Sequence, residues 1–143
     1  MSAQENINIA KQTYATFLRG DIESLLKFYS EDVQWEVYGP SSLPTTGTWR
    51  GQTGIAQFFA KVNELLTPQS FEPQEFIAQD DQVVILGQYS WTVKPTGRTF
   101  SAKWAHVVTI SNGKITRFRE YTDTAAGAEA FAGSSGQAQQ VGR

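Results

Sequence analysis

The sequence predicts one α+β domain in which helices pack on a curved antiparallel sheet. Three observations predict this class. The chain has 143 residues, the size of one ordinary domain. Apolar residues at helical spacing dominate its first half, whereas alternating residues separated by turn signals dominate its second half. Because helices grouped on one side of an antiparallel sheet form an α+β domain, we expect a single domain over residues 1–131. A disordered tail rich in Ala, Gly, Ser and Gln is expected at 132–143.

Three N-terminal helices are expected. In the first, apolar residues recur every three or four positions until Gly20 ends the helix. Asp21 can cap a short second helix. The third helix, from about residue 53 to 66, has the most regular apolar stripe of the chain, and Pro68 lies just past its end. Residues 125–131 are expected to add one last helical turn.

The other regular segments are typical of strands. Residues 33–38 alternate between apolar and polar side chains, as in a half-buried strand. A loop is expected at 39–51, where Gly, Pro, Ser and Thr are frequent. Turn signals such as Asn112-Gly113 divide the second half of the chain into four further strands. These are expected at 70–79, 82–94, 98–110 and 114–122.

The composition excludes several classes of function. The chain has no cysteine and one histidine, which excludes disulfides, thiolate zinc sites and histidine-cluster metal sites. A net charge of −2 provides no basic field for nucleic acid. No segment approaches the roughly 18 apolar residues that span a membrane, and the first residues lack the features of a signal peptide. We therefore expect a cytoplasmic protein with no metal, no cofactor, no nucleic-acid partner and no membrane contact.

Four motifs carry a resemblance to a known family. They lie at 20–22, 28–33, 49–51 and, over the last two strands, 96–124. In this order the chain resembles the nuclear transport factor 2-like superfamily, in particular its SnoaL-like and ketosteroid-isomerase-like branch, over residues 5–131. The resemblance implies a cone-shaped roll of the cystatin type, a small hydrophobic ligand in the open end of the cone, and a homodimer formed through the outer face of the sheet. This scaffold carries isomerases, cyclases, epoxide hydrolases and non-enzymes, so fold alone does not assign an activity.

Two chemistries of the resembled family lack their residues in this chain. The carboxylate base of ketosteroid isomerase aligns with Val37, its first-helix tyrosine falls near Thr13, and its aspartate donor aligns with His106. Limonene epoxide hydrolase has an arginine and an aspartate where this chain has Gly87 and Tyr89. Neither complete set is therefore present.

The SnoaL-type polyketide cyclases provide a closer match. They place a histidine and an acidic residue on the last two strands, and His106 and Glu120 stand at both positions with no gap between them. The acid here is glutamate rather than aspartate, and its extra methylene moves the carboxylate by more than about one ångström. The resemblance implies that this pair transfers protons on a substrate.

Two registers of the last hairpin are open, and they decide whether this pair can meet. A two-residue turn would place His106 opposite Arg119 and Glu120 on the other face of the sheet. A three-residue loop with a glycine bulge would place His106 opposite Phe118 and on the same face as Glu120. We favour the second register because the resemblance favours it. A slip of one residue would reverse the assignment.

The favoured register predicts a cavity with aromatic walls. Its expected lining consists of His106 and Glu120 together with five ligand-binding candidates, which are Tyr14, Trp35, Tyr89, Trp104 and Phe118. Aromatic walls around few polar groups suit a flat or hydrophobic molecule, such as a polyketide, terpenoid or steroid-like ring system.

Three hypotheses for function follow. The first is a cofactor-free acid/base enzyme of the isomerase, cyclase or hydratase type, in which His106 is donor or base and Glu120 is its acid/base partner. The second is a binding or carrier protein in which His106 only orients the ligand. The third is a dimeric structural module whose aromatic side chains fill the cone.

Overall fold

The structure, a computed structural model, describes residues 2–136 of the chain and the side chains of residues 2–133. Within this range one six-stranded sheet forms the frame. Its strands are β1 (Tyr29–Val37), β2 (Gly47–Arg50), β3 (Leu66–Gln79), β4 (Gln82–Val93), β5 (Thr99–Ser111) and β6 (Lys114–Thr122). The helices of the same range are α1 (Ala3–Leu18), α2 (Ile22–Leu26), α3 (Gly51–Leu65) and α4 (Thr124–Gly136).

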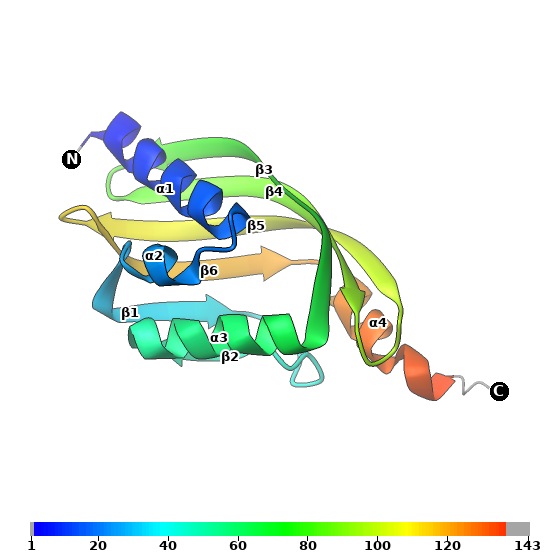
Figure 1. Cartoon of the computed structure of the whole chain (residues 1–143). Helices are drawn as coiled ribbons and strands as arrows, with labels where there is room; N and C mark the ends of the chain where they lie inside the picture. The colour runs from blue at the N-terminus through cyan, green and yellow to red at the C-terminus, as the bar shows by residue number, and fades with distance from the viewer. Residues whose placement is uncertain (1, 137–143) are drawn as a thin grey trace.

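The sheet is strongly curved and open, with strand order β2-β1-β6-β5-β4-β3. Helices α1 and α3 lie across its concave face, and α4 lies beyond one end of the strands (Figure 1). This is the predicted α+β class. The cap expected at Asp21 is also present, because its carboxylate accepts a hydrogen bond from the backbone N–H of Ser24 at 3.1 Å.

The sheet is mixed rather than antiparallel throughout, which corrects the sequence prediction. Strand β1 runs parallel to β6, with Trp35 beside Phe118. No hairpin joins these two strands, since all of β2 to β5 lies between them in the chain, so local turn signals do not determine their direction. The predicted loop at 39–51 also contains β2, which pairs with β1 and is too short to show a clear alternation.

Helix α4 is a fourth helix, whereas three N-terminal helices and one last turn were expected. It runs from Thr124 to Gly136, and Asp123 caps it by accepting a hydrogen bond from the N–H of Ala126 at 3.2 Å. The Thr96 hydroxyl donates a hydrogen bond to the carbonyl of Ala130 at 2.8 Å, which ties the helix to the turn after β4. The tail predicted as disordered at 132–143 thus begins within this helix, and residues 137–143 lie outside the described residues.

The hydrophobic core lies between the concave face and the helices. Alternate residues of β4 and β5 are buried, as the period of a strand requires. The indole of Trp35 stacks on the ring of Phe118 with centroids 3.7 Å apart, which joins β1 to β6. Within the described part of the chain, no helix is long and apolar enough to cross a membrane.

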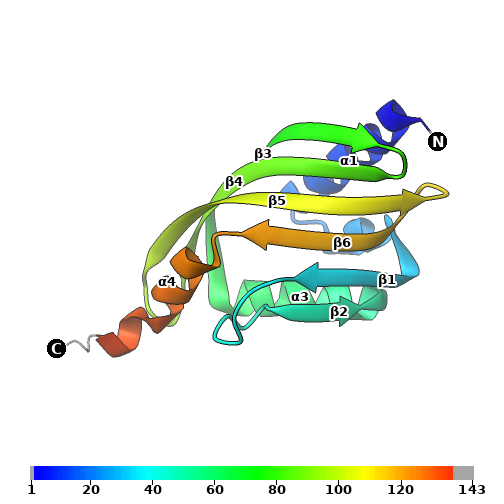
Figure 2. The ribbon, with the colours of Figure 1, turned by 180° about the vertical axis from the view of Figure 1, so that it is seen from behind.

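The convex face of the sheet has no described helix packed over it (Figure 2). There the guanidinium of Arg117 on β6 donates two hydrogen bonds to the carboxylate of Glu36 on β1, at 2.7 and 3.2 Å. These bonds hold the pKa of Glu36 below its ordinary value. The tyrosines at 38 and 121, whose ring centroids are 5.0 Å apart, lie on the same face. Tyr121 is 44% exposed there, so this face combines the Glu36–Arg117 ion pair with open aromatic surface.

Candidate ligand cavity and acid/base pair

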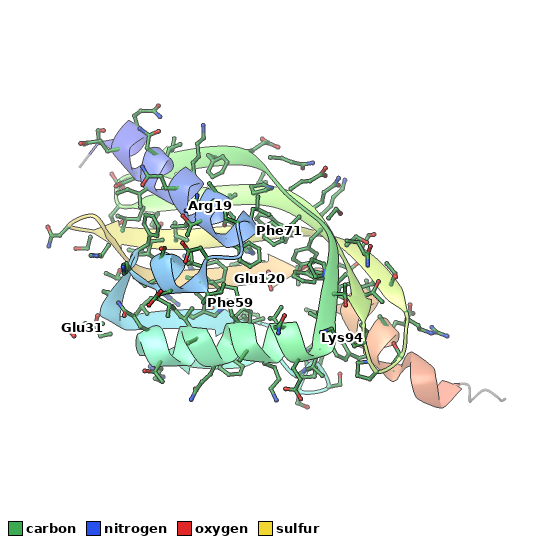
Figure 3. All side chains as sticks on the ribbon, in the orientation of Figure 1. Arg19, Glu31, Phe59, Phe71, Lys94 and Glu120 are labelled. Atoms are coloured by element: carbon green, nitrogen blue, oxygen red, sulfur yellow. The ribbon has the colours of Figure 1, made fainter. Side chains whose placement is uncertain are left out.

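A cavity of about 120 Å³ lies between the helices and the concave face of the sheet. Figure 3 shows Phe59, Phe71 and Glu120 gathered in this interior space, whereas Glu31 and Lys94 lie at the periphery. About half of the lining residues are aromatic, and the seven phenylalanines of the wall are Phe17, Phe58, Phe59, Phe71, Phe100, Phe118 and Phe131. Flat and apolar molecules match such walls.

The last hairpin adopts neither of the two registers considered for it. Asn112 and Gly113 both have positive φ, at 52° and 78°, and form a two-residue turn that pairs Ser111 with Lys114. A bulge then shifts the pairing of β6 by one residue, so that Thr116 is the extra residue before Arg117 pairs with Thr109. With the tight turn alone, the side chains of His106 and Glu120 would lie on opposite faces of the sheet. The bulge returns both of them to the same face.

As a result, His106 on β5 stands directly opposite Glu120 on β6. Nε2 of His106 lies 2.8 Å from Oε2 of Glu120, and their side chains are 4% and 15% exposed. When the Glu120 carboxylate is ionised it can only accept, so in that state the hydrogen bond runs from Nε2–H of His106 to Oε2 of Glu120. The pair is therefore a nearly buried, charge-assisted hydrogen bond in the wall of the cavity.

The other ring nitrogen of His106 is engaged as well. Nδ1 lies 2.7 Å from the hydroxyl oxygen of Tyr14 on α1. Burial raises the pKa of Tyr14 well above its ordinary value, and the charge of Glu120 adds to this effect, so the phenol keeps its proton at neutral pH. When the imidazole is neutral, the Tyr14 O–H therefore donates to Nδ1, and a chain of hydrogen bonds links Tyr14, His106 and Glu120.

A second phenol lies next to the carboxylate. The Tyr89 O–H donates to the hydroxyl of Thr122 at 3.0 Å and lies 3.5 Å from Oε2 of Glu120. Burial raises the pKa of Tyr89, as does the nearby charge of Glu120. Oε1 of Glu120 accepts no hydrogen bond from the residues that the structure describes. One oxygen of Glu120 thus holds the imidazole, the other has no hydrogen-bond donor among the described residues, and the residue itself lines the cavity.

Six of the seven predicted site residues line the cavity, and Trp104 does not. The six are Tyr14, Trp35, Tyr89, His106, Phe118 and Glu120. Trp104 is 3% exposed and lies behind the imidazole, with the two rings stacked at a centroid distance of 3.9 Å. It packs over Gly87 on the neighbouring strand. It can thus position His106, but it does not form the wall for which it was proposed.

Several cavity residues were not predicted from the sequence. Tyr29, Phe71 and Thr122 line the cavity, whereas the sequence placed Tyr29 in the buried stripe of the second helix and Phe71 in a strand. Thr122 could have been found, because it lies two positions after Glu120 on the same strand and therefore faces the same side. Phe71 carried no such signal, since only the curvature of the sheet brings β3 over the cavity.

Nowhere in residues 2–136 do three His, Asp or Glu side chains come together in a way that could hold a metal ion. The chemistry available to this site is proton transfer and hydrogen bonding by His106, Glu120 and Tyr14.

The chain is similar to several known proteins. The model of a family described as a SnoaL-like domain matches residues 10–118. The chain is similar to an NTF2-like protein of Burkholderia xenovorans LB400, with 39% identity over 92% of this chain and 98% of that one, and a TM-score of 0.84. It is similar to TerC, crystallised with polyporic acid, with 34% identity over 89% and 98% of the two chains and a TM-score of 0.80. It is also 23% identical to an uncharacterized protein of Mycobacterium tuberculosis over 131 residues, which are 92% of this chain and 98% of that one.

Proposed function

This chain belongs to the family of SnoaL-like domains, and from that premise we propose that it binds a small, flat, hydrophobic molecule and transfers a proton on it without a cofactor. The reaction is of the isomerase, cyclase or hydratase type. One observation carries the proposal, namely the hydrogen-bonded chain of Tyr14, His106 and Glu120 in the wall of an aromatic cavity.

The ligand class is supported by the wall and by a relative. Aromatic rings on several sides of the cavity offer stacking partners to a planar molecule. TerC was co-crystallised with polyporic acid. We propose that this chain likewise binds a small organic molecule, and that its aromatic cavity is where the molecule lies.

The roles of the three side chains follow from their contacts. Both ring nitrogens of His106 are occupied, so this histidine orients its neighbours and does not itself meet the ligand. The free Oε1 of Glu120 is the base that takes a proton from a carbon beside a ligand carbonyl. When Nδ1 also carries a proton, it donates to the Tyr14 oxygen, and the Tyr14 proton becomes available to the carbonyl oxygen on which negative charge develops.

A binding or carrier protein is the second candidate. It is favoured by two observations, since His106 has no free nitrogen and Val37 occupies the position of the isomerase base. In this case the same cavity holds its ligand without chemical change.

Proton exchange on a model ketone tests the proposal. Purified protein is incubated with 2-tetralone in D₂O, and deuterium uptake beside the carbonyl is followed by NMR. We expect catalysed exchange that falls by about 10²–10⁴-fold in Glu120→Gln, because the variant removes the general base. Glu64→Gln, an exposed carboxylate on α3 outside the cavity, should exchange like the wild type. Saturable binding of the ketone with no catalysed exchange would instead support the carrier.

We further propose that the protein is a cytoplasmic homodimer joined through the convex face of the sheet. That face leaves Tyr38 and Tyr121 exposed at 38% and 44%, beside Arg117 and Arg119. Sedimentation at micromolar concentration should give twice the monomer mass of 15.9 kDa, and Tyr121→Glu should shift the protein toward monomer because like charges would face each other across a twofold axis. A monomer mass for the wild type would contradict this assembly.

A further inference from the structure

The charges in the cavity wall are of one sign. Glu120 and Asp123 bring carboxylates to the lining, and among the described lining residues none is Lys or Arg. The chain has 12 Lys and Arg residues, and those that Figure 3 labels, Arg19 and Lys94, are exposed to solvent. The side chain that can bring a positive charge to the wall is His106, and its Nε2 is already bound to Glu120. An anionic ligand would therefore enter without a free cationic partner.

The phenols of the wall do not change this balance. Burial raises the pKa of Tyr14, Tyr29 and Tyr89, so all three are neutral at physiological pH. Transfer of an unpaired charge from water into such an apolar site is costly, because the lost hydration is not replaced.

The hydrogen bonds around the acid/base pair leave an acceptor without a donor. Nε2–H of His106 is used by Glu120, the Tyr14 O–H by Nδ1, and the Tyr89 O–H by Thr122. Oε1 of Glu120 accepts nothing from the described residues. A ligand that covers this oxygen without donating to it would remove it from water and leave it unsatisfied.

We propose that the cavity selects neutral aromatic molecules that carry a hydroxyl group, which donates to Oε1 of Glu120, and that it rejects carboxylates of the same ring system. This inference rests on the proposed function, because it names the ligand class of the same cavity. A phenol belongs to this class, and so does the enol form of a ring ketone such as 2-tetralone.

Three probes that share a naphthalene ring separate charge from hydrogen bonding. They are 2-naphthol, which is neutral and a donor at pH 7, 2-methoxynaphthalene, which is neutral without a donor, and 2-naphthoate, which is an anion. Binding is followed by quenching of the fluorescence of Trp35 and Trp91, which line the cavity. We expect 2-naphthol to bind at least about tenfold more tightly than either of the others, because a site with an unpaired acceptor discriminates strongly against ligands that leave it unpaired.

The Glu120→Gln variant tests which group causes the selection. It removes the charge at nearly constant size, so the preference for 2-naphthol over 2-naphthoate should shrink to within about threefold, while Glu64→Gln should preserve the wild-type ratio. The three-probe comparison on the wild type needs no variant to fold.

The outcomes are distinct. Binding of 2-naphthoate as tight as that of 2-naphthol would overturn selection by charge, and equal binding of 2-methoxynaphthalene would overturn selection by the hydroxyl donor. Unchanged ratios in Glu120→Gln would overturn the assignment to Glu120. If none of the three probes bound saturably to the wild type, the binding cavity of the proposed function would itself be contradicted, and this selectivity with it.

Discussion

Replacing Gly87 with alanine is expected to lower the free energy of unfolding by about 2–3 kcal/mol, because β4 has no room for a side chain at this position. A Cβ atom there would lie 2.5 Å from the backbone carbonyl oxygen of Glu72 and would overlap the indole of Trp104. The indole cannot retreat, since it is stacked on the His106 ring. Urea unfolding of the wild type and the variant measures the loss.

Gly127→Ala is the matched control. A Cβ at this position on α4 would meet Leu43 and Phe100 at 3.4–3.7 Å, which is ordinary contact, and alanine favours a helix by up to about 1 kcal/mol over glycine. This variant should therefore be as stable as the wild type or more stable. A Gly87→Ala protein that unfolds like the wild type would mean that Trp104 can move, and that the imidazole is not held in place from behind.

The second large effect is expected from the buried pair itself. Removing His106 leaves the carboxylate of Glu120 without its partner in a site that is mostly closed to water, so His106→Ala should lower the free energy of unfolding by about 2–4 kcal/mol at pH 7. A double-mutant cycle with Glu120→Ala isolates the interaction from the packing that each side chain also provides. We expect a coupling energy of about 1–3 kcal/mol.

The same cycle on Glu36 and Arg117 is its control. That pair is also hydrogen-bonded, at 2.7 Å, but the Arg117 side chain is 44% exposed, so its coupling should be below about 1 kcal/mol. Equal coupling energies for the two pairs would contradict the claim that burial makes the His106–Glu120 contact strong.

Local signals in the sequence predicted most of the elements correctly. The apolar stripe of α3, the cap at Asp21 and the turn at Asn112-Gly113 depend on residues within a few positions of one another, and all three are present. The family was also predicted correctly from four short motifs and is confirmed by the match over residues 10–118.

The candidate site was predicted in part. His106 and Glu120 were named from a resemblance, and Tyr14 was named with less reason, yet its hydroxyl proves to be the partner of Nδ1. The role of His106 as donor or base stays a prediction, and both of its ring nitrogens have hydrogen-bond partners within the protein. The chemical roles of these residues remain a proposal for the exchange experiment.

By itself, the sequence determined the order of the helices, most of the strands and the turns between the last strands, because periodicity and turn chemistry act between near neighbours along the chain. Only the tertiary structure decided the parallel pairing of β1 with β6, the bulge at Thr116 and the placement of Tyr14 against His106. These contacts join residues far apart in sequence or depend on a single-residue shift between strands. Their geometry follows from how the whole sheet curves and packs against α1 and α3, which no local pattern records.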